Sequence, residues 1–209
     1  MQSNSKETLQ SKIHLITNIL INESDEYEEI EKCGVGGKIW KSSFVLSSLL
    51  KSHKLSKFVN FENKRILEIG AGAGICGIVC STLNIKNIII TDRDPGCLQL
   101  IERNIESNSE RIKKNLIEIK NFDWINEKEI DELKEKYDII IGSDLLYSPF
   151  MIEPFVKALD LMSNEKTEIL ISIPQRGGED SEYSNFMKII KDTDLFDIEI
   201  IPNDLDDEV

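Results

Sequence analysis

The chain has little of what several enzyme and binding classes require. Its 209 residues contain only two histidines, His14 and His53, and no Gly-x-Ser-x-Gly segment. A zinc site and a Ser-His-Asp hydrolase site are therefore not expected. No apolar run approaches the roughly 18 residues of a membrane span, and residues 1–12 are polar rather than signal-like. We therefore expect no membrane association and a location in the cytoplasm, to which the nucleus can be added.

Basic residues are also scarce. The chain has 25 lysines and arginines against 38 aspartates and glutamates, which gives a net charge of −13. Nucleic-acid binding needs clustered positive charge, so this balance argues against a nucleic-acid partner and favours a basic protein or peptide. The four cysteines form no Cys-x-x-Cys pair. We interpret them, above all Cys76 and Cys80, as small buried apolar residues of a protein from a reducing compartment.

What the chain does have, from residue 65 onward, is a regular alternation of Ile/Leu runs and helical segments. Strands are expected at 65–69, 87–91, 116–120, 137–142, 168–173 and 196–201, and helices near 75–83, 95 onward, 127–136, 149–162 and 181–191. The strand runs are continuously apolar, which indicates burial on both faces. The predicted fold class is therefore α/β, a Rossmann-like, doubly wound, mostly parallel sheet with helices on both faces.

The N-terminal part does not follow this alternation of strands and helices. We predict an extension over residues 1–36 and a main domain over residues 37–209. Ile13–Ile21 and Tyr27–Cys33 are predicted to form a β-hairpin around an acidic turn, followed by a helix that runs to about His53.

A glycine-rich segment follows the first strand of the alternation. Gly70, Gly72 and Gly74 lie between a buried strand and a helix, where backbone N–H groups face a ligand. Asp92 lies 20 residues after Gly72, at the end of the next strand. That spacing places a carboxylate where it can accept hydrogen bonds from a ribose diol. The pair predicts a cofactor that contains a nucleoside.

Glu68 bears on which cofactor this is. A carboxylate two residues before the first glycine would repel a pyrophosphate, but it suits the sulfonium and ammonium groups of S-adenosyl-L-methionine. We therefore predict S-adenosylmethionine. An NAD(P)-dependent oxidoreductase remains the alternative, because Gly72-x-Gly74-x-x-Gly77 also satisfies the dinucleotide pattern.

With these residues in place, the sequence resembles the class I seven-β-strand methyltransferases. More narrowly, it resembles their DxxY protein-lysine methyltransferases, methyltransferase-like proteins that modify chaperones and translation factors. The resemblance runs from about Gly37 to Asn203. Its specific parts are Gly37-x-x-Trp40, an Asp-Trp pair after the third strand, and Asp144-x-x-Tyr147 after the fourth.

The resemblance implies a set of cofactor contacts. Trp40 would cover the cofactor, and Ser143 would line the floor of its site. The methionine end would be held by Glu68, Gly70, Ala71 and Gly72. The ribose would bind Asp92, and the adenine would lie between Asp123 and Trp124. Two alternatives stay open from the residues alone. Trp40 could be a core or hairpin anchor, and Trp124 a helix-packing aromatic.

Asp144 and Tyr147 are the predicted catalytic residues, placed on one helical turn with their oxygens toward the same space. Asp144 would accept a hydrogen bond from the incoming amine, and Tyr147 would shape the acceptor channel. The alternative for Asp144 is to cap the following helix, and the alternative for Tyr147 is to pack against the core. Methyltransferases of base amino groups and glutamine amides resemble one another in a turn at this position that contains a Pro-Pro pair. The segment here lacks that pair.

The predicted function is therefore an S-adenosylmethionine-dependent protein lysine N-methyltransferase, with a chaperone or translation factor as its partner. A histidine or a small-molecule amine remains an alternative acceptor. The chain ends soon after residues 196–201, without the last strand of the family sheet. A non-catalytic cofactor-binding scaffold is therefore also kept open. A monomer is favoured.

Overall fold

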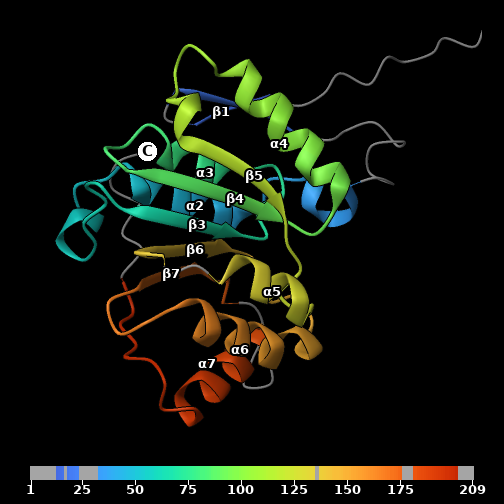
Figure 1. Ribbon diagram of the computed structural model, residues 1–209, viewed down its shortest axis with the longest axis vertical. Coiled ribbons are helices and arrows are strands. Elements are labelled where there is room, and N and C mark those ends of the chain that lie inside the picture. The colour runs from blue at the N-terminus through green and yellow to red at the C-terminus, as the bar shows by residue number, and fades with distance from the viewer. Residues whose placement is uncertain (1–12, 17, 24–32, 135–136, 176–180, 202–209) are drawn as a thin grey trace, which may run out of the picture.

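Figure 1 shows the computed structural model, in which a parallel sheet lies between two layers of helices. It describes residues 13–16, 18–23, 33–134, 137–175 and 181–201. The strands are β3 (Arg65–Ile69), β4 (Asn87–Asp92), β5 (Ile117–Asn121), β6 (Ile139–Ser143) and β7 (Glu168–Ser172). They pair in parallel in the order β5-β4-β3-β6-β7. The predicted α/β, doubly wound architecture is confirmed.

Helices cover both faces of this sheet (Figure 1). One face carries α2 (Lys41–Leu50), α3 (Ile75–Cys80) and α4 (Pro95–Ser107), and the other carries α5 (Glu127–Leu133), α6 (Ile152–Met162) and α7 (Glu182–Asp192). Successive strand residues point to opposite faces, so Ile66 packs in the first core and Leu67 in the second. Both are fully buried, as continuous apolar strands predict.

Short 3-10 helices complete the described elements: η1 (Gly34–Gly37), η2 (Leu55–Lys57), η3 (Lys114–Leu116) and η4 (Pro149–Met151). The start of α4 is as the sequence predicts. The Asp94 carboxylate accepts a hydrogen bond from the Gly96 N–H at 2.8 Å, and Pro95 occupies the first turn. All four cysteines are free and buried.

The order of the strands reverses at β3, which has β4 on one side and β6 on the other. The chain moves outward from β3 to β5 and then returns to place β6 against β3. Ligands of such sheets bind outside the carboxyl ends of the strands, at this reversal. The glycine-rich turn follows β3 there, and Asp144 follows β6.

The N-terminal hairpin differs from the prediction. It consists of β1 (Ile13–Ile16) and β2 (Ile19–Asn22), paired antiparallel, so Ile13–Ile21 is not one strand. Asn18 lies between them with φ +69°, a left-handed conformation that asparagine adopts readily and that suits a tight hairpin turn. The predicted partner Tyr27–Cys33 lies outside the described residues except for Cys33, which precedes η1.

The predicted last strand is also wrong. Residues 196–201 form no strand, and three apolar side chains just before or within them are exposed: Leu195, Ile198 and Ile200. Only Phe196 and Ile201 pack against the cores. Among the described residues β7 pairs with β6 alone. None of the described helices is long and apolar enough to cross a bilayer.

Candidate active site

The glycine turn that follows β3 has a left-handed backbone at three positions. Gly70, Gly72 and Gly74 have φ values of +60°, +56° and +80°. Main-chain hydrogen bonds hold the turn: the Ala71 N–H donates to Thr91 O at 2.9 Å, and the Gly74 N–H donates to Ala71 O at 2.8 Å. L-residues rarely adopt these angles, which explains the spacing of the glycines.

Two of these glycines also lie against neighbouring groups. A Cβ added to Gly72 would lie 2.6 Å from the Gly36 carbonyl oxygen of η1. One added to Gly70 would lie 2.5 Å from the Leu145 side chain and 3.2 Å from the Trp124 ring. The turn is therefore a place where backbone comes close to other groups, as a small-molecule cradle requires.

Asp92, at the end of β4, fixes this turn. Its side chain is 8% exposed. Its Oδ2 accepts a hydrogen bond from the Gly72 N–H at 2.8 Å, and its Oδ1 accepts one from the Asp94 N–H at 2.9 Å. Burial raises the pKa of Asp92, and these two N–H groups oppose that rise. Each oxygen retains a lone pair for a further donor, and the predicted contact with a ribose stays a prediction.

Glu68 lies beneath the first turn of α3. It is 1% exposed, and its Oε2 accepts a hydrogen bond from the Gly77 N–H at 2.8 Å. Burial raises the pKa of Glu68 to about 8, the Gly77 N–H opposes that rise, and the charge of Asp92 adds to it. The structure therefore shows Glu68 holding α3 to the sheet. Its contact with the methionine end of a cofactor stays a prediction.

A cavity of about 430 Å³ lies between the loops that follow β4 and β5. Its lining residues are Arg93, Asp94, Pro95, Asn121, Asp123 and Glu129. The volume falls in the range of small-molecule sites. The lining offers both hydrogen-bond donors and acceptors, which suits a nucleoside. Asp92, at the end of β4, is not part of this lining.

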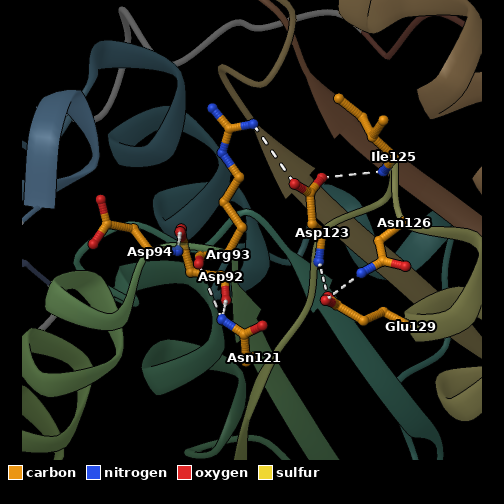
Figure 2. A network of polar contacts seen from close by, with 8 residues as sticks. All are labelled: Asp92, Arg93, Asp94, Asn121, Asp123, Ile125, Asn126 and Glu129. Carbon is orange, nitrogen blue, oxygen red and sulfur yellow. Dashed lines mark hydrogen bonds and ion pairs between the residues drawn. The ribbon is translucent and has the colours of Figure 1, made fainter.

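Figure 2 shows how these side chains are held. The Asp123 carboxylate accepts a hydrogen bond from the Ile125 N–H at 3.1 Å and forms an ion pair with Arg93 at 3.8 Å. Glu129 accepts the Asp123 N–H at 2.7 Å, and Asn121 donates to Arg93 O at 3.0 Å. The predicted adenine residue Asp123 thus lies in the lining of this shallow, open cavity.

Arg93, Asn121 and Glu129 were missed in the sequence. Arg93 follows Asp92 directly, and Asn121 lies two residues before Asp123. Their closeness to predicted site residues was the signal that could have identified Arg93 and Asn121. Glu129 had no such signal.

Trp124 packs inside the second core rather than in the lining. It is 5% exposed, and its ring meets Phe155 in a T-shaped contact with the centroids 5.6 Å apart. The ring atoms next to Gly70 are Cζ3 and Cη2. The indole N–H has no acceptor among the described residues. The structure therefore shows the packing role that the sequence left open, and contact of Trp124 with adenine stays a prediction.

Asp144 follows β6 in a strained conformation. Its φ is +55°, its N–H donates to Ser172 O at 3.0 Å, and its Oδ2 accepts a hydrogen bond from the Ser42 hydroxyl at 3.3 Å. A left-handed aspartate at the end of a central strand is uncommon, and such residues cluster at functional sites. The start of α2, two residues after Trp40, thus holds the carboxylate of Asp144.

The predicted helical turn from Asp144 to Tyr147 is wrong. The left-handed Asp144 ends the strand, and the next residues, Leu145 and Leu146, are both buried. These two leucines anchor an irregular loop between β6 and η4. Tyr147 lies beyond them with 49% of its surface exposed.

Ser143 and Trp40 lie on either side of the same contact between β6 and α2. The Ser143 and Ser43 hydroxyls are 2.8 Å apart. Trp40 immediately precedes α2 and is 37% exposed, and its indole N–H donates to Val35 O at 3.0 Å. The structure thus brings Trp40, Ser143 and Asp144 to one rim, together with Ser42 and Ser43 of α2, which were not predicted as site residues.

The residues of this rim fit S-adenosylmethionine. The glycine turn admits close approach, and the cavity offers polar groups to the nucleoside. Among the described residues, no three His, Cys, Asp or Glu side chains are grouped as metal ligands.

Solved structures share the fold. Trm5b from Pyrococcus abyssi matches with a TM-score of 0.56 and 17% identity, over 89% of this chain and 47% of that one. A putative transferase from Pyrococcus horikoshii matches with a TM-score of 0.56 and 13% identity, over 87% and 60%. Together with the family match that follows, fold and site define an S-adenosylmethionine-dependent methyltransferase of the Rossmann-like class.

The sequence model of a family described as lysine methyltransferase matches residues 22–193, and the chain belongs to that family. The zebrafish (Danio rerio) protein N-lysine methyltransferase METTL21A is 27% identical over 75% of this chain and 68% of its own length. The Arabidopsis thaliana calmodulin-lysine N-methyltransferase is 30% identical over 75% and 50%. The EEF1A lysine methyltransferase 3 of Xenopus tropicalis is 27% identical over 68% and 59%. The chain thus spans about half to two thirds of these relatives.

Proposed function

We propose that this chain transfers a methyl group from S-adenosylmethionine to the amine of a lysine side chain in a protein. Family membership supports the reaction. The single structural observation that carries the proposal is the left-handed Asp144 at the end of β6, held by Ser42 and by the main chain of Ser172. A carboxylate there suits a cationic or amine acceptor.

The bound cofactor supplies a methyl group on a positively charged sulfur, already activated for displacement. The chain's own residues align the reactants. In this proposal the glycine turn and Glu68 hold the methionine end, Asp92 the ribose, and Asp123 and Trp124 the adenine. Trp40 and Ser143 border the methyl group.

The acceptor amine must lose a proton before it attacks, because a lysine amine has a pKa of roughly 10.4 in water. Asp144 accepts a hydrogen bond from the amine and turns its lone pair toward the methyl carbon. The cofactor held at the glycine turn would supply the methyl carbon: its C–S bond would break as the new N–C bond forms, with the electrons of the C–S bond left on sulfur. The proton leaves to water, and Tyr147 lines the path of the lysine side chain.

The proposed partner is a folded protein with basic surface around the target lysine, which complements the net charge of −13. A translation factor or a chaperone fits this description. A relative that carries EEF1A in its name supports the first. We also propose that the protein acts as a monomer in the cytoplasm.

Two measurements test the proposal. S-adenosylhomocysteine should raise the melting temperature and NAD should not, because only a ligand of the folded state stabilises it. Radiolabelled S-adenosylmethionine should then label a lysate protein at lysine, as located by mass spectrometry. Stabilisation by NAD alone would favour the oxidoreductase. Labelling at histidine alone would overturn the choice of lysine.

Asp144→Asn tests the catalytic residue. Asparagine tolerates the left-handed backbone and still accepts the Ser42 hydroxyl, so fold and cofactor binding should survive. Transfer should fall by about 100-fold or more, as for loss of a positioned catalytic group. Asp194→Asn is the matched control, because Asp194 has φ +54° after α7 and lies outside the site. Equal transfer rates in both variants would remove Asp144 from the mechanism.

A further inference from the structure

Two buried asparagines lie at the end of α4, one in its last turn and one at its C-cap. Asn104 and Asn108 are one helical turn apart, and both have an exposed fraction of 0%. Buried side-chain amides need hydrogen-bond partners, because an unpaired one is costly in a low-dielectric interior. Their partners show what this end of α4 does.

The two amides pair with the free edge of β2 as a neighbouring strand would. The Asn108 side chain accepts the Leu20 N–H at 2.8 Å and donates to Leu20 O at 2.6 Å. The Asn104 side chain accepts the Asn22 N–H at 2.9 Å and donates to Asn22 O at 3.2 Å. A hairpin of two strands is marginal alone, so these bonds and the buried Ile19 and Ile21 hold it in place.

Asn104 makes one further contact that Asn108 lacks. Its Nδ2 also donates to Ala73 O at 2.9 Å, inside the glycine turn. Ala73 directly precedes Gly74, the N-cap of α3, so its carbonyl oxygen lies outside the helical hydrogen-bond ladder. Asn104 therefore supplies the donor that the turn needs, and every hydrogen-bonding position of its amide is filled.

The same hairpin also reaches the other side of the site. Glu23, the residue after β2, accepts the Ile39 N–H at 2.7 Å. Ile39 directly precedes Trp40, which leads into α2 and the contact with Asp144. The hairpin thus contacts both the glycine turn, through Asn104, and the segment that carries Trp40.

We propose that Asn104 is a positioning residue that couples the N-terminal hairpin to the cofactor site. It holds Ala73 in the binding geometry only while β2 fixes its amide. Occupation of the glycine turn and docking of the hairpin therefore stabilise each other. This inference rests on the proposed function, because it places the cofactor at the glycine turn.

Calorimetric titration with S-adenosylhomocysteine tests it on the full chain. Asn104→Ala should weaken binding by about tenfold, the effect of one lost hydrogen bond at the turn. Asn108→Ala is the matched control, since it removes the same kind of contact to β2 but none to Ala73. It should loosen β2 in the ligand-free protein and weaken binding clearly less than Asn104→Ala does, because the hydrogen bond to Ala73 remains.

Equal affinities in the wild type and the Asn104 variant would overturn the coupling, and so would equal losses in the two asparagine variants. Failure of the wild type itself to bind would instead overturn the proposed function, and the coupling with it.

Amide exchange in the wild-type protein tests the coupling without any variant. Saturating S-adenosylhomocysteine should slow exchange of the Leu20 and Asn22 N–H groups, followed residue by residue by NMR. The amides of α7, which packs on the opposite face of the sheet, serve as the reference. Slowing in β2 beyond that in α7 supports the proposal even if Asn104→Ala does not fold. Unchanged exchange in β2 overturns it.

Discussion

Replacing Glu68 by glutamine should remove a pH dependence of folding that one buried carboxyl creates. Glu68 is 1% exposed, and burial raises its pKa from 4.5 to about 8 against the opposing hydrogen bond from Gly77. Glutamine has nearly the same shape, and its Oε1 can still accept the Gly77 N–H. The substitution therefore removes the charge while it retains the contact that holds α3.

The sign follows from where the proton is held. Between pH 4.5 and about 8 the folded protein keeps a proton on Glu68 that the unfolded chain releases. Folding stability therefore falls as pH rises through this window. Each pKa unit corresponds to 1.36 kcal/mol. The loss amounts to about 3 kcal/mol between pH 5.5 and 7.5, and to about 5 kcal/mol over the whole window.

Urea unfolding at half-unit steps from pH 5.5 to 8.5 measures this effect. The raised pKa of Asp92 adds a loss of the same sign to both proteins. The informative quantity is therefore the wild type minus Glu68→Gln. This difference should change with pH by about 1.4 kcal/mol per unit below pH 8. Glu165→Gln, at an exposed turn position, is the control and should follow the wild type.

Parallel curves for the wild type and Glu68→Gln would refute the reasoning. They would mean that the Glu68 carboxyl reaches water in the folded protein. Its position beneath α3 would then be a poor guide to its charge state.

The remaining predictions concern the glycine turn and the rim of the cavity. Gly72→Ala should lower the free energy of unfolding by about 3–5 kcal/mol, because it combines left-handed strain with a Cβ 2.6 Å from Gly36 O. Gly34→Ala is its control: φ is +51° but the methyl group meets nothing within 4 Å, so urea unfolding should show a loss of only about 1–2 kcal/mol. Asp123→Asn should weaken S-adenosylhomocysteine binding several-fold in calorimetry. It should change stability by less than about 1 kcal/mol, because its ion pair with Arg93 is solvent-exposed. Unchanged affinity would remove Asp123 from the adenine site.

The central part of the fold could be predicted because its signals are local. Continuous Ile runs indicate strands that are buried on both faces, and Asp94-Pro95 marks the start of α4. The glycine spacing likewise matches three alternate left-handed positions of one turn. Each of these features depends on residues within a few positions of one another.

The errors arise where distant residues decide the conformation. Asp144 was placed on a helical turn, but its backbone is set by Ser172 and by Ser42, which lies 102 residues away. The predicted last strand failed because a strand needs a partner, and residues 196–201 pair with none of the described strands. The role of Asn104 depends on segments 82 and 31 residues away, which no spacing rule connects.

The pairing of β2 with α4 also sets an order in time. Leu20 precedes its partner Asn108 by 88 residues. At synthesis rates of 5–20 residues per second, the hairpin sequence emerges about 4 to 18 seconds before the helix that completes its edge. Two strands alone hold together poorly during that interval. The hairpin is therefore expected to settle only after β3, the glycine turn and α4 are in place, so a segment that is made before the cofactor site is also one of the last to join it.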